Sequence, residues 1–330
     1  MNMFCIMKKF GNYFLTFFVI LFGFGLIIFS SSNISAVNDS LNLFLNAVFP
    51  SLFPFLIVTE LLTYTSVLDW LSSKFKYVMP ILFNVSPIGV YPFIMGIISG
   101  YPVGSRIVAN LREQNRISKA EGEHLLIFTN NAGPLFIIGS VGCGLYLNST
   151  IGFILYFVHF VSCIITGSLF GHIFMKNCRN DLGSVSTNLS FETFGDIVSS
   201  CIKKAFSTLS IVCGFVIIFS LIISMIRVCG ILNLFNNIWI EDICLGILEI
   251  TTGIQMVSSI SASSLMFHLV ATAFLLGFGG ISVSLQVWSV ISKTDLSIKP
   301  YIIGKIFNSF LSGFIMFVFL KVFPCFQFMI

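Results

Sequence analysis

The sequence predicts an all-α polytopic integral membrane protein, and its composition is the first reason. Of 330 residues, 56% are hydrophobic and only 9% are charged, and the mean hydropathy is +1.00. A soluble domain of ordinary composition has about 25% charged residues. The formal net charge of +4 is small and scattered, so it does not indicate a nucleic-acid partner. The positions of Lys and Arg bear on membrane topology instead.

Two broken apolar stretches are the second reason, and they refine the fold class. One reads GIISGYPVGSR at Gly96 to Arg106, and the other reads FTNNAGPLF at Phe128 to Phe136. In hydrocarbon every backbone N–H and C=O must be paired, so irregular backbone survives only inside protein or beside a wet cavity. Two such breaks close together predict a binding site near mid-bilayer, as in transporters built from discontinuous helices.

The nine cysteines indicate neither a disulfide framework nor a metal centre. They are dispersed, most of them in apolar runs, without a CxxC pair or a Cys/His cluster. We interpret them as small buried hydrophobic residues. The sequence predicts no cofactor.

Residues 1–41 are expected to form a cytoplasmic stub and a first transmembrane helix. Lys8 and Lys9 precede an apolar run from Tyr13 to Phe29, and they place the N-terminus in the cytoplasm. A cleaved signal peptide ending near Ser35-Ala36 is the alternative. An uncleaved span is favoured, because membrane segments follow directly.

The next apolar run, Asn42 to Thr65, contains an acidic residue. Pro50 and Pro54 are expected to kink it. A carboxyl group at membrane depth is costly, so Glu60 is a candidate coupling-ion site. The alternative places Glu60 at the interface, near Asp69.

A polar segment from Arg106 to His124 separates the two broken stretches. Ser118 and Glu121 form a capping-box pattern, in which each side chain satisfies an orphan N–H of the helix start. The helix that begins there is expected to enter the membrane at Leu125, break at Asn130 to Pro134 and resume through Val141.

The remaining chain alternates apolar runs with short polar loops. Expected spans are Ile151 to Met175, Ala205 to Ile226, Ser264 to Ile291 and Ile302 to Val322, with a cytoplasmic linker at 176–204 and a weaker run at Ile238 to Ser259. Glu249, Thr251 and Thr252 interrupt the weaker run, and Gly277, Gly279 and Gly280 lie in the middle of the Ser264 run.

The charges favour a topology with two re-entrant hairpins. If Val85 to Ser105 dips in and returns, the basic segment after it is cytoplasmic. If Ile238 to Ser259 is also a re-entrant hairpin, Lys293 and Lys299 lie on the cytoplasmic side as well. Residues 42–175 and 205–330 would then form an inverted repeat, with about seven full spans, two re-entrant hairpins and two broken helices in all.

Three blocks carry a resemblance to a known family. NAVFPSLFPFLIVTELL at Asn46 to Leu62, GIISGYPVGSRIVANL at Gly96 to Leu111 and FTNNAGPLFIIGSVG at Phe128 to Gly142 resemble the YlbJ-like sporulation integral membrane proteins. That family is grouped with nucleoside-recognition, or gate, domains and is distantly similar to concentrative nucleoside transporters. The resemblance implies a role in endospore formation, in the mother cell or its outer forespore membrane, and movement of dipicolinic acid.

A planar dianion such as dipicolinate needs particular groups around it. Half-helix N-termini favour anions, amides donate to carboxylates, an aromatic ring stacks, and glycines admit close backbone approach. The candidate solute-binding residues on these grounds are Ser99, Gly100, Tyr101, Pro102, Gly104, Asn130, Asn131, Gly133, Thr251, Thr252, Gly279 and Gly280. Glu249 would repel a dianion unless protonated or cation-bound, so Glu249 joins Glu60 as a candidate for coupling to H⁺ or Na⁺.

Other functions remain open on the sequence. The chain is expected to contact the lipid bilayer and a small solute, and a homo-oligomer is one alternative for its assembly. A membrane scaffold of the spore envelope and a nucleoside transporter are the competing functions. An intramembrane enzyme is disfavoured, because the sequence has no HExxH, no GxSxG and no paired aspartates in facing spans.

Overall fold

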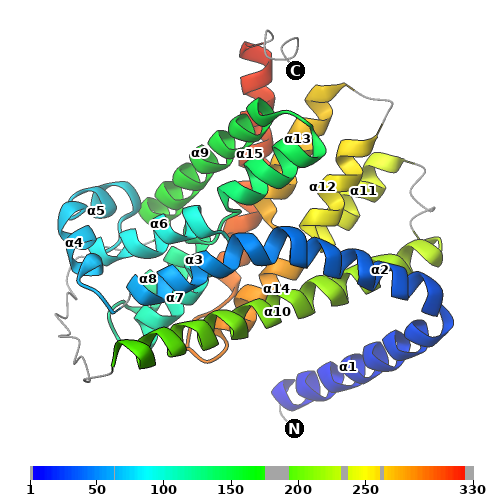
Figure 1. Ribbon diagram of the computed structural model, residues 1–330, viewed down its shortest axis with the longest axis horizontal. Coiled ribbons are helices and arrows are strands. Elements are labelled where there is room, and N and C mark those ends of the chain that lie inside the picture. The colour runs from blue at the N-terminus through cyan, green and yellow to red at the C-terminus, as the bar shows by residue number, and fades with distance from the viewer. Residues whose placement is uncertain (1–2, 63, 175–192, 232–236, 261–263, 324–330) are drawn as a thin grey trace.

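The computed structural model describes residues 3–62, 64–174, 193–231, 237–260 and 264–323. These residues form helices and no strands. Figure 1 shows α9 (Ser149–Phe174), α13 (Leu265–Phe278) and α15 (Lys299–Val322) packed together and crossed by a second layer in which α10 (Phe194–Val228) lies along α2 and α3. The all-helical prediction is confirmed for the described residues.

The N-terminal region contains a second helix where the sequence predicts only one. α1 (Met3–Ile28) is followed at once by α2 (Ser30–Leu43), a π-helical turn (Phe44–Val48) and α3 (Phe49–Leu62). The serine-rich segment Ser30 to Ala36 is therefore helical. Its polar residues are accommodated by packing: α2 lies on α10, and buried Asn33 donates to the carbonyl of Gly25 at 3.0 Å. The chain turns through 98° between α1 and α2.

The first predicted hairpin is present as two short helices. α4 (Val67–Lys74), α5 (Val78–Phe83) and a 3₁₀ turn (Pro87–Gly89) lead into α6 (Val90–Ser99), and α7 (Val103–Glu113) packs against α6. The chain reverses at Gly100 to Pro102, where the Tyr101–Pro102 peptide bond is cis. A single unbroken helix through Val85 to Ser105, which would have refuted the hairpin, is not formed.

The next helix begins and breaks as the sequence predicts. α8 (Lys119–Thr129) starts at Ser118, whose Oγ accepts from Glu121 N at 3.2 Å. Only this half of the capping box forms, because the Glu121 carboxylate accepts from the backbone N and hydroxyl of Ser86 instead. Extended backbone follows, and the chain resumes as the π-helical segment η3 (Leu135–Leu145).

The second half also contains a helical hairpin followed by a broken helix. α10 starts at Phe194, eleven residues before the expected span, and the rest of the predicted linker lies mostly outside the described residues. α11 (Ile238–Leu248) and α12 (Ile250–Ser259) pack against each other, and α13 is separated from α14 (Gly280–Ile291) by Gly279 alone. Both breaks agree with the prediction.

Small and amide side chains hold α9, α13 and α15 together. Thr166 on α9 donates to Asn308 Oδ1 at 3.1 Å, and Asn308 Nδ2 donates to the carbonyl of Gly277 at 3.0 Å. Membrane helices associate through such close packing and interhelical hydrogen bonds.

The number of membrane spans is smaller than predicted if only continuous helices are counted. Four helices of the described chain are long and apolar enough, at Ser149–Ile173, Phe194–Val228, Leu265–Ile291 and Lys299–Val322, and two bent pairs raise the number to six. We expected about seven. The difference lies at α8 and η3, where the break leaves two pieces of 11 residues each, too short to cross separately.

Candidate functional site

The α6–α7 hairpin is seated on the end of α8 by two glycines. A Cβ at Gly96 would lie 1.7 Å from the carbonyl oxygen of Thr129, and a Cβ at Gly104 would lie 1.9 Å from the same oxygen. Only hydrogen fits at these positions. Gly104, which we predicted to contact solute, therefore serves the packing of the hairpin.

The tip of this hairpin meets the break between α8 and η3. A Cβ at Gly100 would lie 3.0 Å from Gly133 N, and a Cβ at Gly133 would lie 3.2 Å from Gly100 N. Two segments of irregular backbone thus cover each other inside the protein. That is where non-helical backbone is tolerated at membrane depth.

The α11–α12 hairpin has the same design with a carboxylate at its tip. A Cβ at Gly253 would lie 2.0 Å from the Cα of Gly246, so the two helices touch. Glu249 separates them and caps α12: its Oε1 accepts from Thr251 N at 3.1 Å and its Oε2 from Thr252 N at 2.7 Å. Glu249 is 3% exposed, and its carboxyl oxygens accept from N–H groups that have no partner within the helix.

The second tip meets the second break. Gly279 and Gly280 have φ values of +85° and +88°, which side chains with a Cβ rarely adopt. A Cβ at Gly280 would lie 3.2 Å from Ile250 N, and a Cβ at Gly279 would lie 3.5 Å from the Tyr101 ring. Tyr101 therefore bridges the two halves of the chain.

The two tips and the first break, together with α10 and α14, line a cavity of about 90 Å³, here called the central cavity. About 10–15 Å³ by this measure holds one water, so several waters fit. Six predicted residues line it: Ser99, Gly100, Tyr101, Gly133, Glu249 and Thr251. Among the described residues, Ser99 Oγ and Tyr101 OH are buried without a hydrogen-bond partner in the protein. The other lining residues are mostly apolar, with Ser140 and Gln286 the polar ones that sequence reasoning missed.

Two helix starts line the central cavity, those of η3 and α12, and two more lie next to the lining. α7, η3, α12 and α14 start at Val103, Leu135, Ile250 and Gly280, immediately after the tips and breaks that meet there. No side chain caps the start of α7, η3 or α14, whereas Glu249 caps α12. Unpaired N–H groups and the helix dipole make such starts favourable for anions.

Asn130 and Asn131 lie behind the first break, outside the lining of the central cavity. Asn131 Nδ2 donates to the carbonyl of Phe128 at 2.7 Å, and its Oδ1 accepts from Lys305 Nζ at 3.3 Å. Asn130 Nδ2 donates to Tyr301 OH at 3.3 Å. The two amides thus tie the break to α15.

Lys305 is the functional candidate that sequence reasoning missed most clearly. It is 1% exposed on α15, and its Nζ lies 5.9 Å from the centre of the Tyr301 ring. No carboxylate pairs with it in the part of the chain that the structure describes. A buried ionisable residue in a membrane helix is costly and therefore a mark of function. The sequence signal that could have identified it is a lysine within a strongly apolar run.

Glu60 is buried apart from the central cavity in an ion-pair cluster. Its Oε1 accepts from Arg106 Nε at 2.8 Å and its Oε2 from Lys204 Nζ at 3.3 Å. Arg106 Nη1 also donates to the carbonyl of Lys204 at 2.9 Å. The cluster joins α3, α7 and α10.

Two predicted residues have other surroundings. Thr252 faces a surface groove rather than the central cavity. The carbonyl of Pro102 accepts from Ser105 Oγ at 2.8 Å and so supports the first turn of α7.

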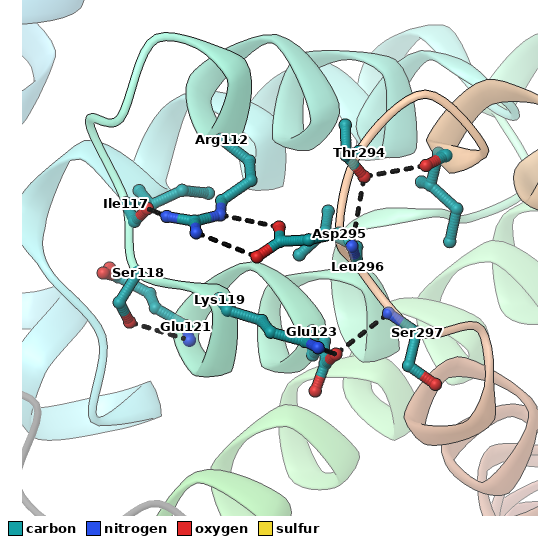
Figure 2. Close-up of polar contacts among 11 residues, drawn as sticks. Arg112, Ile117, Ser118, Lys119, Glu121, Glu123, Thr294, Asp295, Leu296 and Ser297 are labelled. Atoms are coloured by element: carbon teal, nitrogen blue, oxygen red, sulfur yellow. Dashed lines mark hydrogen bonds and ion pairs between the residues drawn. The ribbon is translucent and has the colours of Figure 1, made fainter.

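The basic loops gather at one end of the molecule. Arg112, near the end of α7, makes a two-point ion pair with Asp295 at 2.9 and 3.0 Å (Figure 2). Ser297 N donates to Glu123 Oε1 at 2.9 Å. The Asp295 pKa is lowered, first by the hydrogen bond from Arg112. These contacts, with Arg106 on Lys204, bring together three loops that the charge pattern assigned to one face.

Comparison with known proteins agrees with the three sequence blocks. Residues 45–175 match the Gate family, described as nucleoside recognition. The chain is 31% identical over 304 residues to the sporulation integral membrane protein YlbJ of Bacillus subtilis (strain 168), across 83% of this chain and 74% of that protein. The chain belongs to the YlbJ family of sporulation integral membrane proteins. All three blocks lie within the Gate match, and two of them contain the first tip and the first break of this YlbJ-family chain.

Proposed function

We propose that this YlbJ-family protein moves a small planar anion, dipicolinic acid being the candidate, across a membrane during endospore formation. The observation that carries the proposal is the set of four helix starts that lie in or beside the lining of one cavity. Three of those starts have N–H groups without a side-chain cap, and two carboxylates of a flat solute would satisfy such groups. Tyr101 offers a ring face for stacking.

Glu249 is proposed to couple transport to H⁺ or Na⁺. Its carboxylate borders the central cavity and is buried. A dianion arriving beside it would be repelled unless the carboxylate were neutralised, so protonation or cation binding would accompany the solute. Lys305, behind the break, supplies a positive charge that favours an anion from the other side.

The architecture is proposed to be an inverted repeat of 42–175 and 205–330. Each half contains a helical hairpin with a glycine contact and then a broken helix, and each tip covers the break of its own half. The likeness to concentrative nucleoside transporters is part of this proposal, as are a cytoplasmic N-terminus, a location in the mother-cell-derived outer forespore membrane and a homo-oligomeric assembly.

A nucleoside is the second candidate solute. The Gate family description favours it, and a nucleobase is also flat with polar edges. The central cavity offers Gln286 and Ser140 as neutral hydrogen-bonding partners for such a solute.

The dipicolinate content of spores tests the function against a scaffold role. In a spore-forming host that lacks its own YlbJ-family protein, Gly100→Ala is expected to give spores with little dipicolinate at normal protein level. Its matched control is Gly139→Ala, because a Cβ at Gly139 meets nothing within 4 Å. Normal dipicolinate in both variants would favour the scaffold.

A further inference from the structure

A polar groove lies between α2, α10 and α12 on an otherwise apolar molecule. It has a volume of about 940 Å³, and its walls include Ser35, Asp39, Ser224, Arg227, Thr252 and Gln255. Polar side chains facing lipid are costly, so a surface this polar is expected to border water or protein. The serine-rich α2 is explained if one of its faces lines a wet groove while the other packs on α10.

The position of the groove follows from the length of α10. Lys204, near the start of α10, lies at the end of the molecule that holds the basic loops. Arg227 is 23 residues further along the same helix, which is about 34 Å at roughly 1.5 Å per residue. Val212 and Val216 line the central cavity between these two points. Along α10 the order is therefore basic face, central cavity, groove.

Leu43 belongs to both spaces. It lines the central cavity and it lines the groove, at the junction of α2 and the π-helical turn. Thr251 and Thr252 are likewise adjacent, one facing the cavity and the other facing the groove. The two spaces are thus separated by very little protein.

A cluster of charge pairs lies between the basic face and the residues that line the central cavity. Arg106 and Lys204 both hold Glu60, which is 4% exposed. Arg106 lies one turn after the first hairpin tip, and Lys204 lies two turns before Val212 on α10. The cluster therefore stands between the cavity and the basic face.

We propose that the groove is the aqueous entrance to the central cavity, with Leu43 as the barrier between them and the Glu60 cluster closing the opposite side. What passes through rests on the proposed function. The route itself does not, because it can be measured without transport.

Thiol labelling in nanodiscs tests the route. Ser99→Cys is the reporter in the cavity, in a background whose cysteines are replaced except buried Cys163, and the same background without the reporter is the blank. A membrane-impermeant methanethiosulfonate is expected to label the reporter at least ten-fold faster after Leu43→Ala. The control is Leu45→Ala, because Leu45 is 56% exposed on the adjacent turn.

A second substitution identifies the direction of access. Ser224→Trp in the groove is expected to abolish the gain from Leu43→Ala, whereas Ile218→Trp, on the exposed face of the same helix, leaves it intact. Equal labelling in the Leu43 and Leu45 variants, or a gain that Ser224→Trp does not reduce, would overturn the proposal. The labelling rates test the route even if the protein transports no solute. A failure of the proposed function would be seen separately, as an absence of solute uptake.

Discussion

A single added methyl group at Gly96 tests the seating of the first hairpin. Its Cβ would lie 1.7 Å from the backbone oxygen of Thr129 and 2.8 Å from the carbonyl carbon of Thr129. These are backbone atoms at the end of a buried helix, so no flexible side chain can give way. Overpacking of this kind costs about 1–3 kcal/mol, and contact with backbone places Gly96→Ala toward the upper end.

The control for this prediction is a glycine in an open helical position. A Cβ at Gly214 of α10 meets nothing within 4 Å, and alanine in a helix is favoured over glycine by roughly 0.5–1 kcal/mol. Thermal unfolding of the purified protein in detergent is therefore expected to show Gly96→Ala melting below wild type and Gly214→Ala at or above it. Equal melting temperatures for the two variants would refute the contact between hairpin and helix end.

Three further predictions concern charged groups. Because Arg112 lowers the pKa of Asp295, the stability that the pair adds is present above the unfolded pKa of about 3.9 and is lost as the pH falls through the lower folded value. The difference in melting temperature between wild type and Asp295→Asn should therefore shrink below about pH 5, and a constant difference would contradict the assignment. Glu60→Gln should lower the unfolding free energy by about 2 kcal/mol. This is less than the roughly 3–5 kcal/mol expected for a fully buried pair, because the Lys204 side chain is 44% exposed. Denaturation at neutral pH measures the loss, and an unchanged unfolding free energy would show that the cluster is unimportant for folding. Lys305→Met should reduce solute uptake at least ten-fold. The melting temperature should be unchanged or higher, since an apolar residue can replace a buried charge without loss of stability. Normal uptake by this variant would show that Lys305 has no part in transport.

The breaks in the fold were readable from the sequence because their residues cannot continue a membrane helix. Gly100 and Pro102 mark the first tip, and Gly133 marks the first break. In the second half Gly279 served equally well, and Glu249 marked the tip as a carboxyl group at membrane depth. In each case a local chemical property determined where the helix ends. That property is the backbone freedom of glycine, the missing N–H of proline or the charge of a carboxyl group.

The helical state of α2 was not readable in this way. Its sequence, rich in serine and asparagine, resembles a connection between spans. Its helix is stabilised by contacts that are distant in sequence, such as packing on α10 and the bond from Asn33 to Gly25. Tertiary contact overrode local propensity there.

The candidate site was predicted in part, and the asparagines show why. A polar pair at a break was expected to face the solute. In the structure Asn131 satisfies the break itself through Phe128 and meets Lys305, a residue 174 positions away. Which side of a broken helix faces the cavity depends on where α15 packs, and no local pattern reports that.

Solute uptake into proteoliposomes is the most direct measurement of whether the paired tips form a site for a flat dianion. Purified protein would be given labelled dipicolinate and, in parallel, labelled uridine, with protein-free liposomes as the blank. Accumulation of dipicolinate, reduced by unlabelled dipicolinate and lost in Gly100→Ala, is the predicted result. Accumulation of uridine alone, or of neither solute by protein that retains its native melting temperature, would contradict it.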